Sequence, residues 1–177
     1  MPTMNEQAPM TEALQVRLVS IRCFELQEAV QDELYCVIHQ YDTAGKSKQR
    51  VRLPEAGYWP IHAGEIIYPD SVLLSYTRSA EPLIAGLVFK EEDVPSLSRH
   101  LFETLRQALP DFLPEMVDDL MGVLYVVWLP DQPLKWVYGL NTYDLNLDRT
   151  TEHRVNLLVP GEFHYELLFH LTFQLTQ

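Results

Sequence analysis

Cysteine is scarce in this chain, and a signal peptide is missing. Among 177 residues there are two cysteines, Cys23 and Cys36. A small secreted protein that depends on disulfide bonds would usually contain more. The opening residues, MPTMNEQAPMTEAL, include neither a basic nor an apolar segment, so we do not expect a signal peptide. These absences predict reduced thiols and a cytoplasmic protein.

Long hydrophobic runs and basic residues are also few. The longest uninterrupted apolar run covers residues 123–129, whereas a membrane-spanning helix needs about 20 apolar residues. We therefore predict no membrane span. Lys and Arg total 13 against 25 Asp and Glu, which gives a formal net charge of −12. Such an acidic chain repels phosphate backbones, so we expect no nucleic-acid partner.

The common motifs of enzymes and metal sites are missing too. The sequence contains no G-x-S-x-G, no H-x-x-x-H and no C-x-x-C, the local signatures of a serine nucleophile and of zinc sites. The segment DTAGKS ends like a phosphate-binding loop, but Gln40 stands where that loop needs its first glycine. We therefore predict no cofactor and lean against an enzyme.

Most of the chain shows patterns typical of β-strands. Residues 1–13 are polar and aperiodic and predict a disordered leader, which leaves 14–177 as a single globular domain. Alternating or apolar strand patterns follow, with a slip near Ser20 that indicates a bulge. The predicted strands cover about 16–24, 33–41, 48–54, 71–77, 82–90, 123–129, 134–140, 142–148, 153–159 and the closing residues.

The spacing of the hydrophobic residues changes from that of a strand to that of a helix once, between residues 95 and 121. Leu97, Leu101 and Leu105 fall at helical spacing, a second shorter helical pattern follows, and Gly122 is suited to end it. The order of patterns predicts a mainly β or α+β fold. We expect an antiparallel β-sandwich or twisted sheet of about eight to ten strands, with a two-helix insert near residues 95–121.

The last segment, EFHYELLFHLTFQLTQ, alternates strictly. Every odd position from Phe163 to Leu175 is apolar or aromatic, while the even positions carry His164, Glu166 and His170. A strand rises about 3.3 Å per residue, so the two histidines lie about 20 Å apart and cannot share one metal ion. We predict a solvated face for them. A strand this long also suggests a homodimer formed through the C-terminal strand.

Large side chains gather in the segment GYWPIHAGE. Tyr58, Trp59, Ile61 and His62 form the predicted binding patch, because aromatic anchors dominate interaction hot spots. The alternative is that Trp59 folds back and plugs the core. A cleft that brought Tyr58 and His62 together with an acid such as Asp70 would instead favour an enzyme.

Three oxygen-bearing residues follow one another at a spacing of two. Asp144, Asn146 and Asp148 fit the start of a calcium-binding loop, but Arg149 and Val155 stand where an EF-hand needs Gly and Glu. A looser calcium site at the end of a sandwich remains open. In strand number the chain resembles calcium-dependent phospholipid-binding sandwich domains, a likeness of architecture alone.

Three functions remain in view. The leading prediction is a non-enzymatic binding or protein-interaction module of the cytoplasm, with a protein or small molecule as partner. The alternative is a small-molecule or metal-dependent enzyme whose residues converge only in three dimensions. The third is calcium-assisted lipid binding through Asp144, Asn146 and Asp148.

Overall fold

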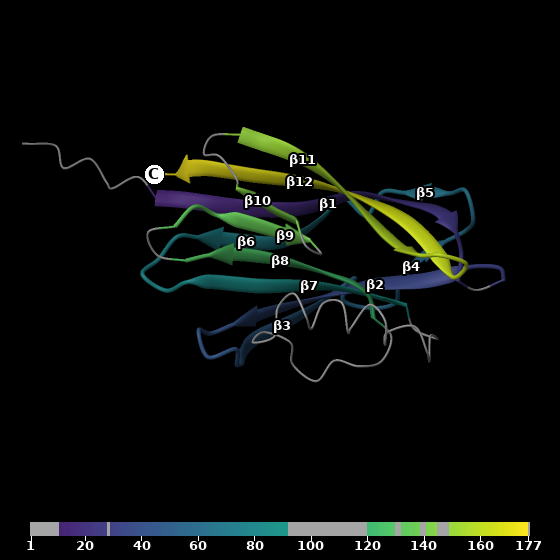
Figure 1. The fold of residues 1–177 in the computed structure, drawn as a ribbon, viewed down its shortest axis with the longest axis horizontal. Coiled ribbons are helices and arrows are strands. Elements are labelled where there is room, and N and C mark those ends of the chain that lie inside the picture. Colours follow the sequence, from purple (N-terminus) through teal and green to yellow (C-terminus); the bar gives the residue numbers. More distant parts are fainter. Residues whose placement is uncertain are drawn as a thin grey trace, which may run out of the picture.

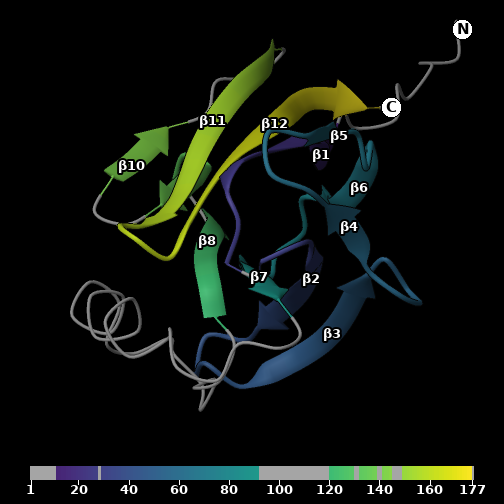
Figure 2. The same ribbon diagram turned by 90° about the vertical axis from the view of Figure 1, so that its right-hand side faces the viewer.

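Two antiparallel β-sheets make up the described part of the protein. The computed structural model describes residues 11–27, 29–91, 120–129, 132–138, 141–144 and 149–176. The strands run along the long axis of the molecule (Figure 1), and a turned view looks along them (Figure 2). The twelve strands are β1 (Thr11–Glu25), β2 (Asp32–Tyr41), β3 (Ser47–Leu53), β4 (Trp59–Ile61), β5 (Ile66–Ile67), β6 (Ser71–Thr77), β7 (Leu83–Glu91), β8 (Leu120–Trp128), β9 (Lys135–Tyr138), β10 (Asn141–Asp144), β11 (Arg149–Val159) and β12 (Phe163–Thr176).

The five-stranded sheet has the order β11-β12-β1, with β5 and β6 both pairing with β1. The seven-stranded sheet has the order β10-β9-β8-β7-β2-β3, and β4 also pairs with β2. Neighbouring strands are antiparallel in both sheets. The two sheets pack face to face, so the predicted β-sandwich is confirmed. Two short strands, β4 and β5, are not among the strands that the sequence predicts.

Strand alternation decides which side chains enter the core. On β12 the odd-numbered positions from Phe163 to Phe173 are at most 5% exposed. They meet inward residues of the other sheet, as Phe89 and Trp136 do with Phe169 at ring-centroid distances of 6.0 and 5.2 Å. The register shift between Leu18 and Ser20 is the predicted bulge. A period of two therefore places one face of each long strand against the other sheet.

The predicted two-helix insert lies mostly outside the described residues, which omit 92–119. Its last two residues were assigned wrongly, because β8 begins at Leu120. Gly122 was also assigned wrongly as a helix stop. It lies within β8, where a Cβ would collide with the side chain of Leu157 on β11. Glycine there allows the two sheets to approach closely.

A buried hydrogen-bond network joins the two sheets. Asp32 on β2 is fully buried, and its Oδ2 accepts hydrogen bonds from the hydroxyl of Tyr165 on β12 and from the Gln27 backbone N–H at 2.9 Å. The thiol of Cys23, also fully buried, interacts with Tyr165. A buried carboxylate is tolerated only when its oxygens are satisfied. The network therefore fixes one end of the sandwich.

We predict that Tyr165→Phe lowers the free energy of unfolding by about 1–3 kcal/mol, because it removes a hydrogen bond from a fully buried carboxylate. Urea unfolding measures the loss. Tyr68→Phe is the control, since Tyr68 is 71% exposed and surface changes of this kind stay within about 0.5 kcal/mol. Equal losses in the two variants would contradict a stabilising role for the network.

Candidate functional site: a polar groove on the five-stranded sheet

The outward face of the five-stranded sheet carries the polar even-numbered residues of β12. Each of the three predicted at this solvated face contacts a side chain of β11: His164 with Asn156 at 3.0 Å, Glu166 with Arg154 at 3.1 Å, and His170 with Glu152 at 3.1 Å. The contacts follow from the antiparallel register, in which each pair is directly or diagonally opposite. The three residues are spread along a solvated ladder, as the distance argument predicts.

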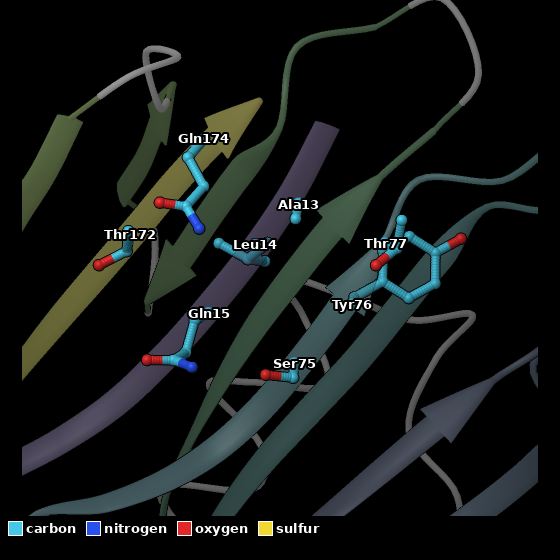
Figure 3. A pocket seen from close by; sticks show the side chains of 8 residues that line it. All are labelled: Ala13, Leu14, Gln15, Ser75, Tyr76, Thr77, Thr172 and Gln174. Carbon is cyan, nitrogen blue, oxygen red and sulfur yellow. The ribbon is translucent and has the colours of Figure 1, made fainter. Parts of the chain in front are cut away.

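A groove opens farther along this face, where β12, β1 and β6 lie side by side. Its volume is about 370 Å³, at the small end of ligand-binding pockets. Figure 3 shows that the lining side chains come from all three strands. They are Ala13, Leu14, Gln15, Ser75, Tyr76, Thr77, Thr172 and Gln174. In the strand register Ala13 lies between Thr77 and Gln174. Because its side chain is small, it leaves space at the centre of the groove.

The lining of the groove is polar but uncharged. Two amides, Gln15 and Gln174, and three hydroxyls, those of Ser75, Thr77 and Thr172, supply donors and acceptors. The Tyr76 hydroxyl already bonds to the carbonyl oxygen of Glu81 at 2.8 Å. None of the described residues that line the groove is Asp, Glu, His, Cys, Lys or Arg. Such a surface can orient a ligand by hydrogen bonds.

Groups with strongly shifted pKa values lie in the interior instead. Burial and the hydrogen bond to Asp32 raise the pKa of Tyr165, and burial raises the pKa of the Cys36 thiol. Both side chains are fully buried, as is Cys23. Shifted pKa values indicate catalysis only where a substrate can reach the group. Here burial in the core causes the pKa shifts. The two cysteines are free thiols, as expected.

The structure divides the predicted binding patch between the core and the surface. Ile61 is fully buried, and Trp59 is half-buried against the main core. Tyr58 packs instead edge-to-face on Tyr35, at a ring-centroid distance of 6.0 Å. His62 is exposed and contacts Glu65 at 3.0 Å through Nδ1. Of the four, Tyr58 and His62 therefore offer surface to a partner, and the patch itself stays a prediction.

The described residues do not bring Tyr58, His62 and Asp70 into one cleft. Asp70 accepts a hydrogen bond from Arg17 at 3.1 Å at the five-stranded sheet, whereas Tyr58 packs against β2 of the other sheet. No group of three or more His, Cys, Asp or Glu that could hold a metal ion occurs in the part of the chain the structure covers. The enzyme alternative gains no site from these residues.

Most of the predicted calcium ligands lie outside the described residues. Asp144 is the last residue of β10, opposite Lys135 in the register. Asn146 and Asp148 belong to residues 145–148, which the structure does not describe. The calcium site stays a prediction.

The strands predicted from sequence do not bring the groove residues together: the first of them begins at about residue 16, after Ala13, Leu14 and Gln15 of the lining. Gln15, Ser75 and Thr172 belong to strands far apart in the chain, and only the pairing of β1 with both β12 and β6 makes them neighbours. Pairing between distant strands leaves no local signal in a single sequence. The polar, uncharged character of these positions was the available clue.

Comparisons with known proteins give a distant structural likeness. No protein-family model and no curated protein sequence matches the chain. Among solved structures, it is similar to human GIVD cytosolic phospholipase A2 in complex with methyl gamma-linolenyl fluorophosphonate and terbium chloride, at 10% identity and a TM-score of 0.45. It is also similar to a structure described simply as human GIVD cytosolic phospholipase A2, at 12% sequence identity and a TM-score of 0.44. The match covers 97% of this chain but at most 18% of those chains, and so distant a likeness assigns no function.

No helix among the described residues is both long and apolar enough to cross a membrane.

One buried and one half-buried imidazole, those of His39 and His153, predict a loss of stability in mild acid. Burial lowers the pKa of His39, with the charges of Arg50 and Lys90 adding to the effect, and burial lowers the pKa of His153. As the pH falls through the ordinary histidine pKa, about 6.5, the unfolded chain takes up protons before the folded chain does. The free energy of unfolding therefore falls from pH 7.5 towards pH 5.

Urea unfolding of the wild type and of a His39→Gln, His153→Gln double variant measures this effect. We expect the variant to lose less stability between about pH 7.5 and pH 5 than the wild type, whatever its stability at neutral pH. Equal pH dependence in the two proteins would show that these two histidines do not cause it.

A calcium titration tests the predicted ligands Asp144, Asn146 and Asp148. If they bind the ion, calcium at about 100 times its dissociation constant stabilises the fold by about 2.7 kcal/mol and raises the melting temperature. Asp144→Asn with Asp148→Asn would abolish the rise, while Glu152→Gln on β11 would not. An unchanged melting temperature in the wild type would remove the calcium site.

Proposed function

We propose that the protein is a non-enzymatic binding module that holds a neutral, hydrogen-bonding ligand in the groove between β12, β1 and β6. The observation that carries the proposal is the composition of the lining, whose described residues offer amides and hydroxyls and include no charged side chain. The predicted cytoplasmic location fits the two free, buried thiols and stays part of the proposal.

Electrostatics limits the ligand class. An ion bound in this groove would lose hydration without meeting a countercharge in the lining, which is costly. A neutral molecule with hydroxyl or amide groups can exchange its hydrogen bonds to water for bonds to Gln15, Thr172 and Gln174. Small saccharides and short peptides both present such groups. The groove therefore favours neutral polar ligands.

The charged residues nearby are occupied with one another. Arg78 forms an ion pair with Glu12, and its guanidinium lies 4.9 Å from the ring centroid of Trp128. Lys48 pairs with Glu81 at 2.5 Å. Glu12 and Arg78 adjoin the lining residues Ala13 and Thr77 in the chain, and Glu81 accepts a hydrogen bond from Tyr76. These neighbouring charges are therefore paired within the described residues. This supports selection by shape and hydrogen bonding.

Calorimetric titration with two probe sets tests the proposal: neutral mono- and disaccharides, and N-acetylated dipeptide amides. We expect at least one set to bind, and Gln15→Ala and Gln174→Ala each to weaken binding by about three- to tenfold, because each removes about one hydrogen bond. Glu152→Gln, on the same face but outside the lining, is the matched control.

Two outcomes would contradict the proposal. One is the absence of binding by both probe sets. The other is binding that Glu152→Gln weakens as much as the two glutamine variants do, since this would place the ligand elsewhere on the sheet.

A further inference from the structure

A second surface lies on the other sheet, at the strand β3. Residues 46–52 read KSKQRVR and hold four of the chain's 13 cationic residues without a single acid. The rest of the chain carries nine cations against 25 acids. A cationic segment in such an acidic protein is a local departure from the overall charge, and charge of one sign selects partners of the other.

The strand geometry places Arg50 and Arg52 on one face. Arg50 lies opposite His39 and Arg52 opposite Val37 in the antiparallel register with β2. Residues two apart on a strand share a face and lie about 6.6–6.8 Å apart. Lys48 continues the alternation towards the turn. The side chains therefore form a row of positive charge at the spacing of a β-strand.

Aromatic rings hold Arg52 in position. Its guanidinium lies 4.5 Å from the ring centroid of Tyr35 and 5.1 Å from that of Tyr58, and Nη1 donates a hydrogen bond to the carbonyl oxygen of Pro54 at 2.7 Å. A guanidinium has five N–H donors, so most remain for a ligand. Because the group is already ordered, binding a carboxylate costs less side-chain entropy.

Arg50 is exposed and makes no ion pair with any residue that the structure describes. β3 is also the end strand of its sheet, because among the described strands it pairs with β2 alone. An end strand presents backbone N–H and C=O groups that another extended chain can use. Within the described part of the chain, the unpaired charge of Arg50 and an unpaired strand edge thus occur on the same strand.

From these observations we propose that the outer edge of β3 binds an extended acidic peptide, with Glu or Asp at every second position, as an added strand. Carboxylates on alternate residues of the incoming strand would lie opposite Arg50 and Arg52, and opposite charges across strands stabilise the pairing. Lys48 is already paired with Glu81 at 2.5 Å. A second copy of β3 would place cation against cation, so self-pairing is disfavoured.

A peptide fits this edge better than an anionic membrane does. The cations follow one strand in single file, and the adjacent loops carry acids, Asp42 and Glu55, whose charge an anionic bilayer would repel. A flat lipid surface would also make no use of the free backbone edge. The strand spacing and the edge together favour the peptide.

Fluorescence anisotropy with the full chain tests the proposal. The first probe is a labelled, acetylated seven-residue peptide amide with glutamate at every second position and threonine or valine between. The second has the same composition with its glutamates in one block, and the third is the first peptide N-methylated at alternate residues. We expect the alternating peptide to bind at least about tenfold more tightly than either of the others.

Variants locate the site. We expect Arg50→Gln and Arg52→Gln each to weaken the alternating peptide by about tenfold. Arg50 is exposed and unpaired within the described chain, so its variant should fold normally even if the Arg52 variant loses packing against the tyrosines. Arg154→Gln, which removes the same charge from the other sheet, should leave the affinity unchanged.

Several outcomes would overturn the proposal. Equal binding of the block peptide or of the N-methylated peptide would show attraction by charge without strand addition. Equal weakening by Arg154→Gln would place the peptide elsewhere. If the alternating peptide did not bind but phosphatidylserine vesicles bound in an Arg50-dependent way, the edge would be assigned to a lipid surface. If neither the peptide nor the vesicles bound, the proposed site would be removed.

Discussion

The hydrogen bond between Asp32 and Tyr165 is the constraint on which the sandwich depends at one end. Asp32 begins β2 in one sheet, and Tyr165 lies on β12 in the other, 133 residues away along the chain. The Asp32 carboxylate is completely buried, so the structure is stable only while its partners hold it. The backbone N–H of Gln27 is the second partner and ties the connection between β1 and β2 to the same group.

Asp32, Tyr165 and Cys23 interact with one another in the interior, and both proposed recognition surfaces lie outside it. The groove on the five-stranded sheet offers neutral hydrogen-bonding groups, and the edge of β3 offers ordered positive charge. β12 is paired along its length with β1 and β11. The homodimer through that strand stays a prediction.

Much of this architecture follows from local patterns. The alternation from Phe163 to Leu175 and the slip near Ser20 correctly predict β12 and the bulge in β1. The short strands β4 and β5 were missed because Pro60 and the nearby glycines favour a loop locally, and only pairing with β2 and β1 orders them. Gly122 was misassigned because its role is to admit Leu157 from a distant strand. The groove was missed for the same reason: three strands, distant in sequence, form it.

The central claim is that the protein binds ligands on its outward faces without transforming them. NMR spectroscopy of the isotope-labelled full chain, with the neutral saccharides and the dipeptide amides in the same tube, observes protein and ligand together. The account predicts shifts confined to amides of the groove, such as those of Gln15, Thr77 and Gln174, with ligand signals unchanged over days. New product signals, or shifts centred on His62 instead, would contradict it.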